Sequence, residues 1–262
     1  MSNQIQFYVD EKACIGCGLC ASDCLRHSIK LQNNKAAFAG VDCFGCGHCL
    51  AICPENAVKV SGCNDDVWEI SGKQTFLEEK ALKMHLKARR SVRQYKDTPV
   101  EKEKIEKIIE AGRLTPTGSN LQNVRYIVVQ KEIDALEDAV LAQYKTPAGG
   151  PEPSAPPPPG YSLDRLKRGF LFHKAPLLII AVSPREINAC LAAMNMELMA
   201  EALGLGTVYV GLFTRPANEN KKLRESLGVT EEEIIAACLA IGYPKVQYRR
   251  TAPRKAANVV WR

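Results

Sequence analysis

The pattern of apolar and polar positions separates a short, cysteine-dense leading part from a longer part in which helices and strands alternate. Helical periodicity begins at Phe76 in LEEKALKMHLKARR, and a second amphipathic helix is predicted over 100–114, where Ile105, Ile108 and Ile109 share a face. Apolar runs predict a further helix over 185–203 and strands over 127–129, 177–182, 207–213 and 234–241. This mixture predicts an α+β fold.

The leading part is an internal repeat. Residues 14–31, CIGCGLCASDCLRHSIKL, and residues 43–60, CFGCGHCLAICPENAVKV, have the same cysteine spacing. Each cysteine run is followed by a short helix-like turn and a small apolar segment, 28–31 or 57–60. The duplication predicts a small domain with pseudo-twofold symmetry.

Two domains and a linker are expected. We place the first domain at 1–61, an acidic and weakly patterned linker at 62–75, and the second domain at 76–262. Cys63 falls in the linker, where an unpaired thiol is favoured over a third redox role. The Pro- and Gly-rich segment 146–160 is predicted to be a loop, either a cover over a substrate site or a solvated insertion.

Composition fits a soluble protein of the cytoplasm. The chain has 262 residues, 46% of them hydrophobic, which is enough for a sizeable core. Eight of its eleven cysteines belong to the two runs, and residues 1–10 lack a basic-then-apolar signal pattern, so a reducing compartment is expected. The longest strongly apolar stretch, 175–182, is too short to cross a bilayer as a helix, so no membrane partner is expected.

The charge is unevenly distributed. The net charge is +6, residues 1–61 are balanced and residues 62–80 carry −3, so the remainder carries +9. No recognisable module for reading nucleic acid accompanies these bases, and no nucleic-acid partner is expected. Most of them are interpreted as solvated surface, and a minority as phosphate ligands.

The two cysteine runs predict two iron-sulfur clusters. Each reads Cys-x-x-Cys-x-x-Cys-x-x-x-Cys, and in the bacterial form of this run the fourth cysteine binds the neighbouring cluster. That rule assigns one [4Fe-4S] cluster to Cys14, Cys17, Cys20 and Cys53, and the other to Cys43, Cys46, Cys49 and Cys24. Structural zinc, the alternative, uses more widely separated ligand pairs. Residues 5–61 resemble the bacterial two-cluster ferredoxins.

Cys190 and Cys238 lie in predicted apolar elements of the second part and are interpreted as small hydrophobic residues without chemistry. A Rossmann site for a dinucleotide is disfavoured, because Gly204-Leu205-Gly206 lacks the third glycine and the following helix. The run from Arg89 to Arg93, RRSVR, offers guanidinium forks and a hydroxyl suited to a phosphate monoester.

The order RRSVRQY, PTGSNLQ, GLGTVYVG and IGYP followed by RRTAPRK resembles the FMN-dependent nitroreductase family over roughly residues 80–262. The resemblance implies an α+β domain with a mixed sheet flanked by helices, and a homodimer with FMN at the subunit interface. It implies that the FMN phosphate and the ribityl or pyrimidine edge are held by Arg89, Arg90, Ser91 and Arg93, helped by Arg250 or Arg254.

Further roles come from the same resemblance. The segment implied to reach the flavin of the other subunit contains Pro116, Thr117, Asn120 and Gln122, and Val210 and Gly211 pass its reactive side. The chain departs from the family at Asn123 and Val124, where many members have Pro-Trp. The basic partner of the flavin pyrimidine, expected before Ala175, has only Lys167 and Arg168 as candidates. No side chain is assigned as a nucleophile or general acid, since the flavin carries the chemistry.

Together the two halves predict an iron-sulfur flavoprotein oxidoreductase. Electrons from a low-potential, ferredoxin-like donor are expected to pass through two clusters to FMN and on to a nitroaromatic, quinone or similar small electrophile. Three alternatives stay open: an electron-relay protein serving a protein partner, a reductive dehalogenase-type or ene-type reductase on the same scaffold, and a metal-stabilised binding module.

Overall fold

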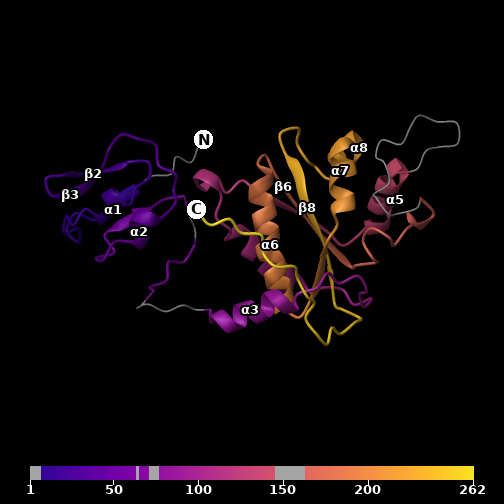
Figure 1. The fold of residues 1–262 in the computed structure, drawn as a ribbon. Coiled ribbons are helices and arrows are strands. Elements are labelled where there is room, and N and C mark those ends of the chain that lie inside the picture. The colour runs from indigo at the N-terminus through magenta and orange to yellow at the C-terminus, as the bar shows by residue number, and fades with distance from the viewer. Residues whose placement is uncertain (1–6, 63–64, 71–76, 145–162) are drawn as a thin grey trace. The chain divides into compact units, whose positions relative to one another are not determined.

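The computed structural model describes residues 7–62, 65–70, 77–144 and 163–262 (Figure 1). The chain forms two compact units, one of residues 1–74 with 117–122, the other of residues 75–116 with 123–262. Two features named from the sequence, Cys63 and the loop 146–160, lie outside the described residues.

The first unit is built from the two halves of the repeat. Strands β1 (Phe7–Val9) and β4 (Val58–Val60) pair antiparallel, as do β2 (Ile29–Gln32) and β3 (Lys35–Phe38). Each half contributes one short helix, α1 (Leu19–Ser22) or α2 (His48–Ala51). Both helices follow a glycine in the left-handed conformation, Gly18 with φ 76° and Gly47 with φ 74°. Residues other than glycine adopt this conformation only with strain. The backbone therefore repeats together with the sequence.

The second unit is organised by a four-stranded antiparallel sheet. Its order is β5 (Arg125–Val129), β6 (Leu177–Ser183), β8 (Ile234–Gly242) and β7 (Gly206–Tyr209). At the β7 edge, Ser91 adds a parallel bridge to Thr207, and the Val92 N–H donates to the Thr207 carbonyl (2.9 Å). The predicted α+β class is confirmed. The parallel pairing expected of a mixed sheet is limited among the described residues to the Ser91 bridge, because the three strand pairs of this sheet are antiparallel.

Helices cover both faces of this sheet. One face packs against α4 (Lys102–Arg113) and α6 (Glu186–Ala202), which lies along β6 and β8 (Figure 1). The other packs against α5 (Ile133–Tyr144), α7 (Gly211–Glu219) and α8 (Lys221–Ser226). Helix α3 (Glu79–Ala88) precedes the sheet and buries none of its residues. Two single 3₁₀ turns complete the elements, Gly118–Asn120 and Leu163–Arg165.

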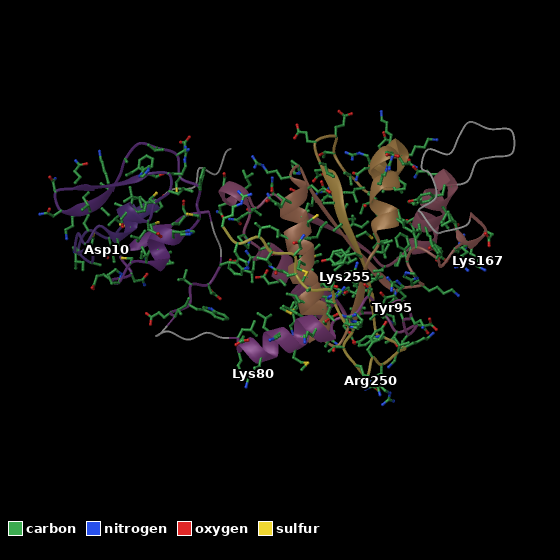
Figure 2. The ribbon with its side chains drawn as sticks, viewed as in Figure 1. Asp10, Lys80, Tyr95, Lys167, Arg250 and Lys255 are labelled. Atoms are coloured by element: carbon green, nitrogen blue, oxygen red, sulfur yellow. The ribbon has the colours of Figure 1, made fainter. Side chains whose placement is uncertain are left out.

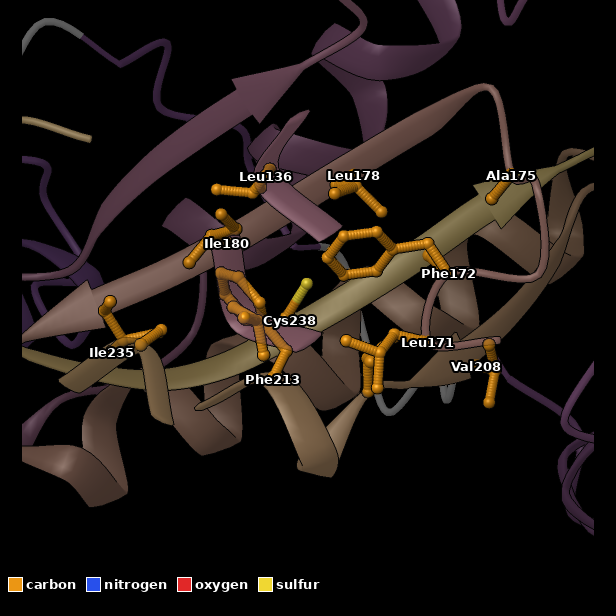
Figure 3. Close-up of a cluster of buried hydrophobic side chains, with 14 of the residues drawn as sticks. Leu136, Leu171, Phe172, Ala175, Leu178, Ile180, Val208, Phe213, Ile235 and Cys238 are labelled. Carbon is orange, nitrogen blue, oxygen red and sulfur yellow. The ribbon is translucent and has the colours of Figure 1, made fainter. Parts of the chain in front are cut away.

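Strand β6 explains why its sequence is a continuous apolar run. All seven residues are buried, and alternate side chains point to opposite faces. Leu177 and Ile179 enter the core under α4 and α6, whereas Leu178 and Ile180 enter the core that contains Phe172 and Phe213 (Figure 3). The predicted strand over 177–182 is confirmed.

The structure differs from the sequence predictions in three respects. The predicted strand over 207–213 ends at Tyr209, because the chain turns at Val210 into helix α7. Helices α5 and α8 were not predicted. Cys190 is exposed on α6 and is not a core residue, whereas Cys238 is buried as predicted. No helix among the described residues is both long and apolar enough to cross a bilayer.

Candidate functional site

Two pockets in the first unit are each lined by four cysteines. The first, about 350 Å³, is lined by Cys14, Cys17, Cys20 and Cys53. The second, about 440 Å³, is lined by Cys24, Cys43, Cys46 and Cys49. Each pocket therefore takes three cysteines from one half of the repeat and the fourth from the other half. These are the two crossed sets expected from the spacing.

Backbone N–H groups point at the sulfur atoms of these pockets. Ser28 N lies 3.3 Å from Cys24 Sγ, and Ala57 N lies 3.3 Å from Cys53 Sγ, four residues after the cysteine in both cases. Gly45 N makes the same contact with Cys43 Sγ. Hydrogen bonds to sulfur favour the thiolate and tune a bound cluster.

Burial acts in the opposite direction on two of the thiols. Desolvation raises the pKa of Cys49 to about 11 and also raises the pKa of Cys20. Such thiols become ligands when a metal centre supplies the opposing charge. In the part of the chain that the structure describes, no three His, Cys, Asp or Glu side chains surround a point fit for a single ion. Spaced thiols around a cavity suit a cube of iron and sulfide better than one zinc ion.

In the second unit, the first two arginines of the RRSVR segment, Arg89 and Arg90, have different surroundings. Arg89 follows α3, and its Nη1 donates to Glu197 Oε1 (2.8 Å). The Glu197 side chain is only 2% exposed, and Thr207 Oγ1 also donates to it (3.3 Å). Arg89 therefore fastens the segment to α6 and β7.

Arg90 lines a separate, open pocket between α3 and the C-terminal segment. Its Nε is buried and has no hydrogen-bond partner among the described residues. Of the two late bases, Arg254 lines this pocket and Arg250 does not. Arg250 is exposed (Figure 2). Lys83 and Lys87 line it too. An orphaned guanidinium N–H beside three more cations suits an anionic oxygen such as a phosphate.

Arg93 is exposed, and its charge acts on His173 in a turn that the sequence does not predict. Burial, and secondly the Arg93 charge, lower the pKa of His173. His173 and Lys174 have φ values of 54° and 56°, and Ala175 N donates to the Phe172 carbonyl (2.9 Å), the pattern of a type I′ turn. Two successive left-handed residues other than glycine are strained, which is a feature of functional sites.

Lys167 and Arg168, the two sequence candidates for the basic partner of the flavin pyrimidine, lie in different surroundings. Arg168 pairs with Asp138 and Asp134, and Lys167 is exposed in the preceding connection (Figure 2). His173 and Lys174 directly precede Ala175, where the sequence places the basic partner of the flavin pyrimidine. Their positive φ values, which mark the turn, cannot be read from the sequence.

The segment from Pro116 to Gln122 is a strained loop. Ser119, Asn120 and Gln122 have φ values of 55°, 53° and 45°. Thr117 Oγ1 accepts a hydrogen bond from Gln122 N (2.9 Å), which closes the loop, and Pro116 is exposed before it. The loop thus has the local strain typical of a ligand-contacting segment.

Val210 and Gly211 form the start of α7. Val210 N donates to the Cys238 carbonyl of β8 (2.8 Å), which continues the β7–β8 pairing to the first turn of α7. Gly211 is exposed, and a methyl group added to it would meet no atom within 4 Å. A flat ligand can therefore approach this backbone closely.

Comparison with known proteins places these features in a family. Residues 86–243 match the Nitroreductase family, and residues 13–57 match the 4Fe-4S dicluster domain. The "Putative NADH dehydrogenase/NAD(P)H nitroreductase" of Archaeoglobus fulgidus is 30% identical over 170 residues, covering 64% of this chain and 87% of that protein.

Two solved structures share the fold. A nitroreductase with bound FMN from Bacteroides fragilis has a TM-score of 0.55 and 22% identity, covering 68% of this chain and 98% of that one. A nitroreductase with bound FMN from Desulfitobacterium hafniense has a TM-score of 0.55 and 24% identity, covering 70% of this chain and all of that one.

Fold and sequence together define an oxidoreductase with an iron-sulfur domain ahead of an α+β catalytic domain. The chain belongs to the nitroreductase family, and its leading part is a 4Fe-4S dicluster domain. The predicted fusion is confirmed.

Proposed function

We propose that this oxidoreductase passes electrons from a low-potential donor through two [4Fe-4S] clusters to FMN, and on to a small electrophilic acceptor such as a nitroaromatic or a quinone. The observation that carries the proposal is the pair of four-cysteine pockets in a chain of the nitroreductase family. Cys14, Cys17, Cys20 and Cys53 would hold one cluster, and Cys24, Cys43, Cys46 and Cys49 the other.

The FMN phosphate is assigned to the pocket lined by Arg90 and Arg254. The buried, unpartnered Arg90 Nε supports this assignment, because a phosphate oxygen would satisfy it. Arg89 would act through its ion pair with Glu197, which fixes the turn that carries Arg90 and Ser91. Arg93 and the turn at His173 and Lys174 would serve the pyrimidine edge.

Bound FMN would accept electrons singly or in pairs and deliver them to the substrate, while the protein orients and tunes it. Gly211 would leave the backbone free to approach the flavin. The exposed start of α7 would direct backbone N–H groups and the positive end of the helix dipole towards it.

A second copy of the chain would complete the site. Helix α6 exposes Ile187 (67%), Leu191 (48%) and Met194 (36%), which recur at helical spacing and form one apolar stripe. An exposed apolar stripe on a long helix is typical of a protein interface. We assign it to a homodimer in which Pro116, Thr117, Asn120 and Gln122 of one copy reach the flavin of the other.

Fusion of the two domains makes cluster-to-flavin transfer intramolecular and so raises the effective concentration of the internal donor. We therefore expect a ferredoxin-like protein to reduce the enzyme faster than a nicotinamide does. Anaerobic stopped-flow reduction of the flavin by reduced ferredoxin, NADH and NADPH tests this. Equal or faster reduction by either nicotinamide would overturn the assignment of the donor.

A further inference from the structure

Helix α5 carries two polar side chains that are almost completely buried and that none of the assignments above uses. Glu137 is 1% exposed and Tyr144 is 4% exposed. They are seven residues apart, so they lie on the same face of the helix, the face that packs into the core of the second unit. Their hydrogen bonds go to two different backbone segments.

Glu137 organises the segment that leads into the strained turn. Its carboxylate accepts hydrogen bonds from Gly169 N (2.6 Å), Leu171 N (2.6 Å) and Phe172 N (3.2 Å). The turn at His173 and Lys174 follows immediately, and strained turns persist only where the surroundings fix them. Three charge-assisted bonds from one buried side chain supply that constraint.

Tyr144 supplies a hydrogen-bond donor that α7 lacks. Pro216 lies inside this helix and has no N–H, so the carbonyl of Leu212, four residues earlier, loses its helical partner. The Tyr144 hydroxyl donates to that carbonyl (2.6 Å). Leu212 directly follows Gly211, so Tyr144 holds the first turn of α7 at the proposed flavin-facing backbone.

The two braced segments are also in contact with each other. Phe172, the residue before the turn, packs on Phe213 of α7 with ring centroids 5.4 Å apart (Figure 3). Burying a carboxylate costs free energy that burying an apolar side chain does not, and hydrogen bonds to the carboxylate offset that cost. Here those bonds fix the segment that leads into the His173–Lys174 turn and contacts Phe213 of α7, next to which the proposed function places the flavin.

We propose that Glu137 and Tyr144 are positioning residues of the flavin site, through which α5 sets the geometry of the His173–Lys174 turn and of the Gly211 backbone. The inference rests on the proposed function, because it requires FMN to bind between these segments. Neither side chain would touch the cofactor.

The test uses the full chain, purified anaerobically with its clusters, depleted of FMN and titrated with FMN. Glu137→Gln keeps the size but loses one anionic acceptor, and Tyr144→Phe loses only the hydroxyl. We expect each variant to raise the Kd for FMN about tenfold, the effect of removing a supporting partner of a bound group, and to change the visible circular dichroism of the flavin. Ile108→Ala, on the opposite face of the sheet, is the control for lost stability.

Three outcomes separate the possibilities. If Glu137→Gln and Tyr144→Phe raise the Kd for FMN and change the flavin spectrum, while Ile108→Ala lowers the Tm as much as Glu137→Gln and leaves both unchanged, the positioning role is supported. If both α5 variants bind FMN with the wild-type Kd and spectrum, the inference is wrong and the proposed function stands. If the wild-type chain binds no FMN, the proposed function fails first, and the inference fails with it.

Discussion

Adjacent arginines in one motif have different structural tasks. Arg89 forms a buried ion pair with Glu197, 108 positions away, while the neighbouring Arg90 leaves its Nε unpartnered among the described residues. The sequence suggests phosphate chemistry for both, because nothing near Arg89 in the chain reveals Glu197. A motif thus predicts the kind of ligand better than it predicts which of its bases contacts that ligand.

The cysteine assignment can be tested one residue at a time. Cys53→Ser should remove the cluster of the first pocket and Cys24→Ser that of the second, so each variant should lose about half of its iron. Cys190→Ser is the matched control, because Cys190 is an exposed free thiol outside both pockets. Iron and sulfide assays with EPR on anaerobic protein provide the measurement. Loss of iron from the Cys190→Ser variant would contradict the assignment.

Glu201 predicts a pH dependence of stability. Burial, and secondly the nearby Glu197, raise the pKa of Glu201 to about 7, compared with 4.5 unperturbed. The folded state therefore holds a proton that the unfolded chain has already lost, so the free energy of unfolding falls as pH rises from about 4.5 through about 7. The contribution is at most about 3 kcal/mol.

Glu201→Gln removes this titration. Relative to wild type, the variant should gain stability between pH 5.5 and pH 8.5, measured by anaerobic urea unfolding followed by circular dichroism. Glu225→Gln on α8, whose side chain is 63% exposed, is the control and should show no comparable gain. A wild-type-like pH profile for Glu201→Gln would show that Glu201 ionises normally in the folded state.

At the scale of elements, prediction succeeded where one physical signal dominated. Strand β6 is apolar on both faces because helices cover both sides of the sheet, and α4 has a single apolar stripe. The run after β7 was ambiguous, because GLF is equally apolar in a strand or at a helix start. Helix α5 was missed because its buried face includes Glu137 and Tyr144, which break the apolar pattern.

Two glycines near β7 have separable roles. A methyl group at Gly206 would meet Val92 Cγ2 at 2.5 Å, so Gly206→Ala should push the Ser91–Val92 segment off β7 and cost about 1–3 kcal/mol. At Gly211 a methyl group meets nothing within 4 Å, so Gly211→Ala should keep the wild-type Tm yet weaken FMN binding. Thermal denaturation and FMN titration of both variants provide the test. Wild-type FMN affinity in Gly211→Ala would refute close approach at this residue.

At the scale of the whole molecule, the exposed stripe of α6 predicts the oligomeric state. Leu191→Glu places a charge at the centre of this stripe and should convert a dimer into a monomer in sedimentation velocity runs. FMN retention should fall with dissociation, since the partner's loop would be lost. Val128→Glu, at a site of similar exposure on β5, is the control. A Leu191→Glu dimer that keeps its FMN would exclude this face as the interface.

The crossed cysteine pockets bear on how the dicluster domain matures. Each pocket needs a fourth wall from the opposite half of the repeat, so neither half can enclose an inorganic core alone. Inserting the first core would bring both halves into register and so preorganise the second cavity. Assembly of the wild-type chain should consequently be cooperative, with the second core entering more readily than the first, so that half-loaded wild-type chains are scarce during biogenesis.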